Sequence, residues 1–173
     1  MAVRFSRMFR FARALCVAFA LCLTNAPAPL AASDRGAVTN LPIPRFVSMK
    51  ASEANIRRGP SLTHRVDWIF RHQGTPLIVT GEYGHWRRVV DRDGMGGWIH
   101  YALLSGTRTV IIDAETVELR KQPLDSAQVM ARAEQNVIAT LDECREGWCR
   151  IAAGGRRGWV PQAELWGVTL STQ

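Results

Sequence analysis

The feature that most constrains this chain is an internal repeat of about sixty residues. The matching segments are residues 97–106 with 158–167, 85–89 with 147–151, and 55–60 with 118–123. The longest pair aligns without a gap and shares glycine, tryptophan, alanine, leucine and glycine at the same positions. Because the spacing drifts only from 61 to 63 residues, the sequence predicts two copies of one small structural unit in tandem.

Each copy consists of short segments rich in β-branched and aromatic residues, which glycine separates. In the first copy these segments are residues 66–70, 76–82, 86–90 and 98–100. Residues 91–94 (Asp-Arg-Asp-Gly) and 153–156 (Ala-Gly-Gly-Arg) have the composition of hairpin turns at equivalent places. No long helical pattern competes with these signals. The sequence therefore predicts an all-β protein made of two small, partly open β-barrels.

Units of this size bury a thin core and usually need further packing or a cross-link. In the first copy we expect residues 41–50 to add packing through Phe46 and Val47. Residues 110–112 (Val-Ile-Ile) lie at the junction and suit either barrel, and we assign them to the closing strand of the first.

The second copy contains two cysteines, Cys144 and Cys149, five residues apart. A tight turn around Glu146 and Gly147 would place them opposite each other on antiparallel strands, so we predict a disulfide. The alternative is a pair of buried free thiols. A zinc site is disfavoured because all the histidines lie in the first copy.

Residues 1–32 have the features of a cleaved signal peptide. They contain four arginines and no acidic residue before an apolar run, and small residues precede Ser33. This run has about half of the ~20 residues that span a membrane. We therefore expect export to the periplasm or the medium, with membrane contact only through the signal peptide. Retention of the segment as an anchor is the alternative.

Removal of residues 1–32 leaves 141 residues with 18 basic and 15 acidic side chains, and a net charge of +3. The charges of both signs are interspersed. Nucleic-acid binding needs a concentrated basic surface, so this charge distribution argues against it.

Three motifs in each copy resemble those of the bacterial Src-homology-3-like domain. In the first copy they are residues 55–61 (Asn-Ile-Arg-Arg-Gly-Pro-Ser), 84–89 (Gly-His-Trp-Arg-Arg-Val) and 97–99 (Gly-Trp-Ile). The expected organisation is a signal peptide over 1–32, an N-terminal extension over 33–50, a first barrel over 51–112 and a second barrel over 113–170. The resemblance implies a binding module of the bacterial envelope, commonly associated with cell-wall peptides.

The sequence departs from the related eukaryotic domains at positions that bind proline-rich peptides. The groove tyrosine is replaced by Leu103 in one copy and Glu164 in the other, and His100 takes the place of the groove proline in the first copy. A polyproline ligand is therefore not expected. The second copy also has Gln122 in place of the motif glycine, which suggests a structural role for that copy.

Strand alternation identifies candidate ligand-binding residues. If Val89 points into the barrel, then Trp86 and Arg88 point outward, where they combine apolar area with a planar charged donor. The alternative is that the tryptophans close the barrel ends or lie between the modules. The candidates are Tyr83, His85, Trp86, Arg88, Tyr101 and, as a weaker case, Arg57 in the first copy, with Trp148 and Arg150 in the second.

No motif of a hydrolase, phosphate-binding loop or dinucleotide site occurs. We therefore predict no catalytic residue, metal or cofactor. The leading hypothesis is a non-enzymatic module that binds a cell-wall peptide or an envelope protein. The alternative is a scaffold or self-associating adaptor without a wall ligand.

Overall fold

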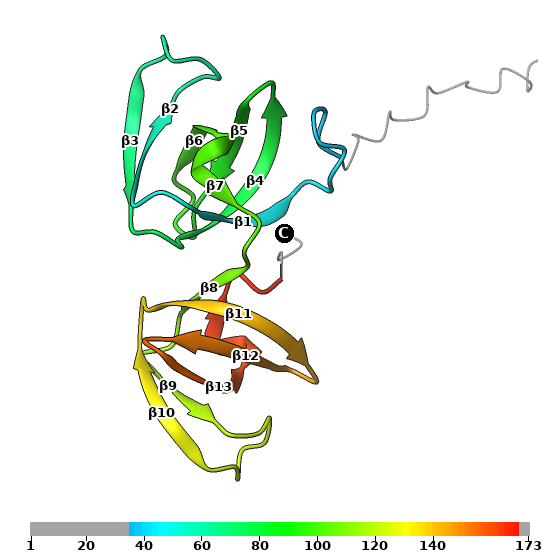
Figure 1. The fold of residues 1–173 in the computed structure, drawn as a ribbon, viewed down its shortest axis with the longest axis vertical. Helices are drawn as coiled ribbons and strands as arrows, with labels where there is room; N and C mark the ends of the chain where they lie inside the picture. The colour runs from blue at the N-terminus through cyan, green and yellow to red at the C-terminus, as the bar shows by residue number, and fades with distance from the viewer. Residues whose placement is uncertain (1–34, 170–173) are drawn as a thin grey trace, which may run out of the picture. The chain divides into compact units, whose positions relative to one another are not determined.

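The computed structural model describes residues 35–169, which form two antiparallel sheets of seven strands each (Figure 1). Its only helical segments in that range are single 3-10 turns, η1 (Tyr101–Leu103) and η2 (Gln162–Glu164). The predicted all-β class with two tandem copies is confirmed. The segment predicted as a signal peptide lies outside the described residues. Within residues 35–169, no helix has the length and apolarity that crossing a membrane requires.

The first sheet has the strand order β3-β2-β6-β5-β4-β1-β7. Its strands are β1 (Arg45–Met49), β2 (Glu53–Arg57), β3 (Val66–Arg71), β4 (Pro76–Tyr83), β5 (Trp86–Val90), β6 (Gly96–His100) and β7 (Leu104–Ser105). Four of them agree with the predicted segments to within two residues at each end.

The second sheet repeats this topology in the order β10-β9-β13-β12-β11-β8-β14. Its strands are β8 (Thr109–Ile112), β9 (Thr116–Arg120), β10 (Val129–Glu134), β11 (Ile138–Arg145), β12 (Trp148–Ala153), β13 (Arg156–Pro161) and β14 (Leu165–Trp166). In each sheet the first and last strands of the order are edge strands with a partner on one side only, so neither sheet closes into a complete barrel.

Alternation of buried and exposed side chains along the strands builds one hydrophobic core within each sheet. The first core contains Met49, Ala54, Ile56, Leu77, Val79, Val89 and Ile99. The second contains Val110, Ile112, Val117, Leu119, Ala139, Cys149, Ile151, Val160 and Leu165. Most members of the first core recur in the second at the spacing of the sequence repeat. The repeat therefore reflects a requirement to fill the same interior twice.

Strand pairing differs from the expected boundaries at both ends of the first copy. β1 was assigned to an N-terminal extension, but it pairs with β4 and β7 inside the first sheet. Residues 110–112 were assigned to a closing strand of the first barrel, but β8 pairs with β11 and β14 in the second sheet. That assignment was wrong because a short apolar strand with all four residues buried carries no signal of which core it fills.

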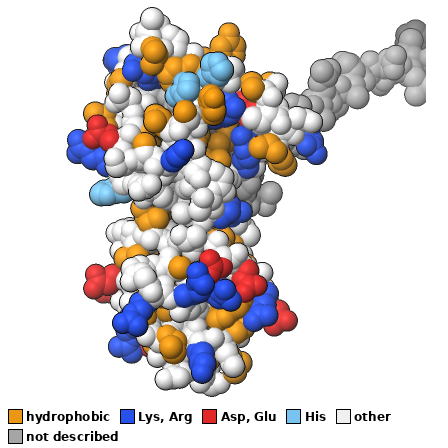
Figure 2. All heavy atoms as spheres, viewed as in Figure 1, with side chains coloured by type: hydrophobic (Ala, Val, Ile, Leu, Met, Phe, Trp, Pro, Cys, Tyr) orange, Lys and Arg blue, Asp and Glu red, His pale blue; other side chains and the backbone are white. Residues whose placement is uncertain are grey.

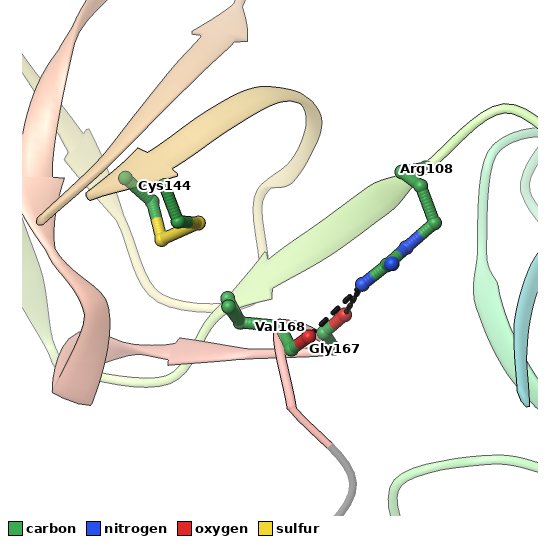
Figure 3. Close-up of a disulfide and its surroundings, with 5 residues drawn as sticks. Arg108, Cys144, Gly167 and Val168 are labelled. Carbon is green, nitrogen blue, oxygen red and sulfur yellow. Dashed lines mark hydrogen bonds between the residues drawn. A yellow bond between two sulfur atoms is a disulfide. The ribbon is translucent and has the colours of Figure 1, made fainter. Parts of the chain in front are cut away.

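The predicted disulfide is present between Cys144 and Cys149, which are cross-strand partners on β11 and β12 (Figure 3). The turn between them places Glu146 and Gly147 at positive φ, as a two-residue hairpin turn requires. Just before β8, the Arg108 guanidinium donates to the carbonyl oxygens of Gly167 and Val168, which follow β14, at 2.8 and 3.0 Å (Figure 3).

Candidate ligand-binding site

Strand β5 presents alternate side chains to the core and to solvent. Val89 is fully buried and Arg87 is only 7% exposed, whereas Arg88 is exposed and Trp86 is half-buried. This is the orientation expected from alternation, with Trp86 and Arg88 on the outer face of the sheet.

The register of neighbouring strands extends this outer face sideways. Arg88 is the cross-strand partner of Trp98 on β6, and Trp98 is in turn the partner of Arg57 on β2. One step along the face, Trp86 lies opposite His100. Directly paired residues share a face, so these pairs form two adjacent rows of side chains.

Four rings of the first domain form an aromatic cluster, which comprises His85, Trp86, His100 and Tyr101. The ring centroid of His100 lies 5.0 Å from that of Tyr101, 5.6 Å from that of Trp86 and 5.8 Å from that of His85. His85 and Tyr101 lie 5.7 Å apart. Figure 2 shows histidine side chains beside hydrophobic ones on the surface of this domain. The cluster is accessible, since Tyr101 is 48% exposed.

The backbone fixes the positions of these rings. Gly84 has a positive φ in the turn between β4 and β5, which brings His85 next to the end of β6. The Tyr101 amide donates to the His85 carbonyl at 2.9 Å. His100 caps η1 by accepting at Nδ1 from the Ala102 amide at 3.3 Å, and this bond orients its ring.

Beneath the cluster, the buried Arg87 is held on several sides. Its guanidinium donates to the carbonyl oxygens of Gly84 and Trp86 at 2.9 and 2.8 Å. Its Nε lies 3.5 Å from Oε1 of Glu82, and its Cζ lies 5.8 Å from the centroid of the Tyr101 ring. Arg87 therefore links the aromatic cluster to a buried carboxylate.

Glu82 also anchors the strap, defined here as residues 36–41, which precedes β1. Its carboxylate accepts from the Val38 and Thr39 amides at 3.0 and 2.8 Å and from the Thr39 hydroxyl at 2.6 Å. Arg45 donates to it at 2.8 Å. Burial alone would raise the pKa of Glu82, but the bonds from Thr39, Arg45 and Val38 outweigh burial and lower it to about 2.

Arg57 has a structural role. Its guanidinium donates to the Leu62 and His64 carbonyl oxygens at 3.0 and 2.8 Å, which holds the loop that follows β2. In the second copy, Arg120 donates to the Ala127 carbonyl at 2.9 Å in the same way. Both hydrogen bonds engage the Arg57 side chain, which the sequence predicted as a weaker ligand contact.

The second copy also has a tryptophan and an arginine on the outer face of the equivalent strand, but its arginine is paired with acidic side chains. Trp148 and Arg150 are half-buried, as alternation predicts. Arg150, however, lies 3.3 Å from an Asp142 oxygen and 3.4 Å from a Glu143 oxygen. The arginine is therefore neutralised by its own domain.

Of the predicted residues, the structure brings together His85, Trp86 and Tyr101, and Tyr83 pairs with Trp86 across β4 and β5. Sequence reasoning missed the contribution of His100 and Trp98. The cross-strand partners of Trp86 and Arg88 could have been derived by pairing residues 86–90 with 96–100 through the predicted turn. That pairing would have placed Trp98 and His100 on the outer face beside Arg88 and Trp86.

The class of protein follows from the two all-β copies and the sequence motifs that they share. The sequence matches the bacterial SH3 domain family twice, over residues 50–106 and 113–167, which together make up more than half of the chain. The protein therefore belongs to the bacterial SH3 domain family, whose members are binding domains.

Two solved structures from Trichomonas vaginalis are similar to the chain. NlpC2 is 15% identical, with a TM-score of 0.33, and the match covers 71% of this chain and 48% of that one. NlpC1 is 14% identical, with a TM-score of 0.33, and the match covers 79% and 50%. The chain thus spans about half the length of each structure. A search of curated proteins gave no match.

Proposed function

We propose that this protein is an exported, non-enzymatic module of the cell envelope that binds peptides of the peptidoglycan wall through the outer face of its first domain. The aromatic cluster is the observation that carries the proposal. Three rings with centroids 5.0 to 5.8 Å from the His100 ring, together with His100 itself and the exposed Arg88 on the same face, offer apolar area and a planar donor to one ligand.

Export to the periplasm is part of the proposal, and the signal-peptide features of residues 1–32 support it. A disulfide in the second domain suits an oxidising compartment. The wall is a ligand present in that compartment, and short peptides that carry charge and apolar groups are its accessible recognition elements. Membership of a family of binding domains supports a ligand rather than a reaction.

The test compares retention on purified peptidoglycan sacculi with capture of solubilised envelope proteins, using the oxidised chain from Ser33 onward. Trp86→Ala should lower retention on sacculi by about tenfold, because it removes the largest ring of the cluster, which packs against His100. Tyr101→Ala changes a more exposed ring and should weaken retention without affecting the fold. Trp148→Ala, in the second domain, is the matched control and should retain binding.

A protein scaffold is the second candidate, and exposed apolar residues on the hairpin of β2 and β3 favour it. Leu62, Trp68 and Ile69 are 75%, 44% and 49% exposed. Such side chains suit contact with another protein or with a second copy of this chain. Light scattering that gives a dimer dissociated by Leu62→Ser, together with no retention on sacculi, would favour the scaffold and exclude the wall ligand.

A further inference from the structure

The first domain has a pocket of about 300 Å³ along β5 and β6. Its lining includes Arg58, Asp67, Arg88, Gly96, Gly97 and Trp98. All of these come from the first domain. Arg88 and Trp86 lie two residues apart on the same face of β5, so one bound molecule can contact both the pocket and the cluster.

The pocket carries uncompensated positive charge. Asp67 is occupied, since it accepts from Arg58 at 3.1 Å and from Arg65 at 2.7 Å. The bond from Arg65 is the main cause of the lowered pKa of Asp67, which therefore stays ionised and paired. Arg88, by contrast, is exposed and its side chain makes no hydrogen bond or ion pair within residues 35–169.

The second domain shows what an arginine at this position binds. Arg88 corresponds to Arg150, and both face a tryptophan of the next strand, Trp98 or Trp159. Both also follow a β-bulge at the same place, so Gly81 pairs with Arg88 where Glu143 pairs with Arg150. The carboxylates of Glu143 and Asp142 contact Arg150.

The first domain lacks these acids. Gly81 replaces Glu143 and Thr80 replaces Asp142, which leaves the arginine without a carboxylate on the same scaffold. We infer that the Arg88 pocket is a carboxylate-binding subsite, and that the second domain fills its equivalent position with its own acidic side chains. The inference rests on the proposed function and specifies the chemical group of the wall peptide that is held there.

The first experiment measures binding of two soluble probes to the chain from Ser33 onward by NMR. The probes are N-acetyl-alanyl-alanine with a free carboxylate and the same dipeptide with a C-terminal amide. The free acid should shift the Trp98 indole and Arg88 guanidinium signals, and the amide should bind about three- to tenfold more weakly. Equal shifts with both probes, or no shift at these groups, would overturn the inference.

Matched variants at Gly81 test the inference by introducing the acidic residue that the second domain has at the equivalent position, Glu143. Gly81→Glu should supply Arg88 with an internal carboxylate and abolish the preference for the free acid. Gly81→Gln adds similar bulk without charge and should keep the preference. The glycine does not require a positive φ, and an added Cβ would lie 3.5 Å from the Arg88 Cβ, an ordinary contact. Arg88→Gln should lose the preference, whereas Arg150→Gln should retain it.

Retention on sacculi separates this inference from the proposed function. Sacculi whose carboxyl groups have been converted to amides should retain the protein about three- to tenfold less than native sacculi. Equal retention on both would overturn the carboxylate subsite and leave the wall ligand standing. Absence of retention on native sacculi would refute the proposed function, and the dipeptide titration would still decide whether Arg88 binds a carboxylate.

Discussion

The buried Glu82 predicts a specific dependence of the first domain's stability on pH. Its pKa is 4.5 in the unfolded chain and about 2 in the folded protein. A carboxyl group with a lowered pKa stabilises the folded state above its unfolded pKa, and this stabilisation is lost as the pH falls towards the folded pKa. The relevant window therefore lies between about pH 5 and about pH 2.

The size of the effect follows from the structure. At about 1.4 kcal/mol for each pH unit between the two pKa values, the ceiling is about 3 kcal/mol. The Glu82 side chain is fully buried, but its partner Arg45 is 18% exposed, and solvent there weakens the attraction. We therefore expect about 2 kcal/mol of unfolding free energy to depend on ionised Glu82.

The assay compares the native chain with Glu82→Gln by urea denaturation followed by amide NMR, which reports each domain separately. At neutral pH the variant's first domain should be less stable by about 2 kcal/mol, and this difference should vanish near pH 2. Other acidic groups titrate equally in both proteins and cancel. A difference that stays constant from neutral to acid pH would refute the role assigned to the ionised carboxylate.

Three further changes test the structural framework. Cys144→Ser should cost the second domain about 2 kcal/mol, measured by urea denaturation, because the short loop that the disulfide closes limits its entropic benefit. Gly96→Ala should destabilise the first domain by about 2 kcal/mol or more, because the new Cβ would collide with the Val89 carbonyl. Gly106→Ala, whose Cβ would face open space, is the control, and equal melting temperatures of the two variants would contradict this packing. Arg57→Gln should speed proteolysis within the loop that follows β2, and an unchanged cleavage rate would show that its two hydrogen bonds do not order the loop.

The sequence predicted the features that depend on local pattern. Alternation along residues 86–90 correctly separated Val89 from Trp86, and the turn chemistry around Gly147 correctly placed the two cysteines opposite each other. The repeat predicted two equal folds because both cores must be filled by the same positions.

Features that depend on long-range pairing were not predicted. The partners of β8 were misassigned because three consecutive apolar residues fit either core. His100 was considered only as a replacement for a groove proline, since fifteen residues separate it from His85. The strap and Glu82 were also missed, because no local pattern indicates that a carboxylate will accept amide hydrogen bonds from residues more than forty positions away.

The repeat also shows how one scaffold gave two chemically different domains. Glu82 and Arg87 are cross-strand partners on β4 and β5, and Cys144 and Cys149 are cross-strand partners on β11 and β12 at the equivalent place. An ion pair in the first domain thus corresponds to a disulfide in the second. The disulfide needs no further partner, whereas buried Arg87 also contacts the Tyr101 ring. The ion pair that stabilises the first domain therefore also contacts the aromatic cluster, so the proposed ligand, once bound to the cluster, would couple its binding to the stability of that domain through Arg87.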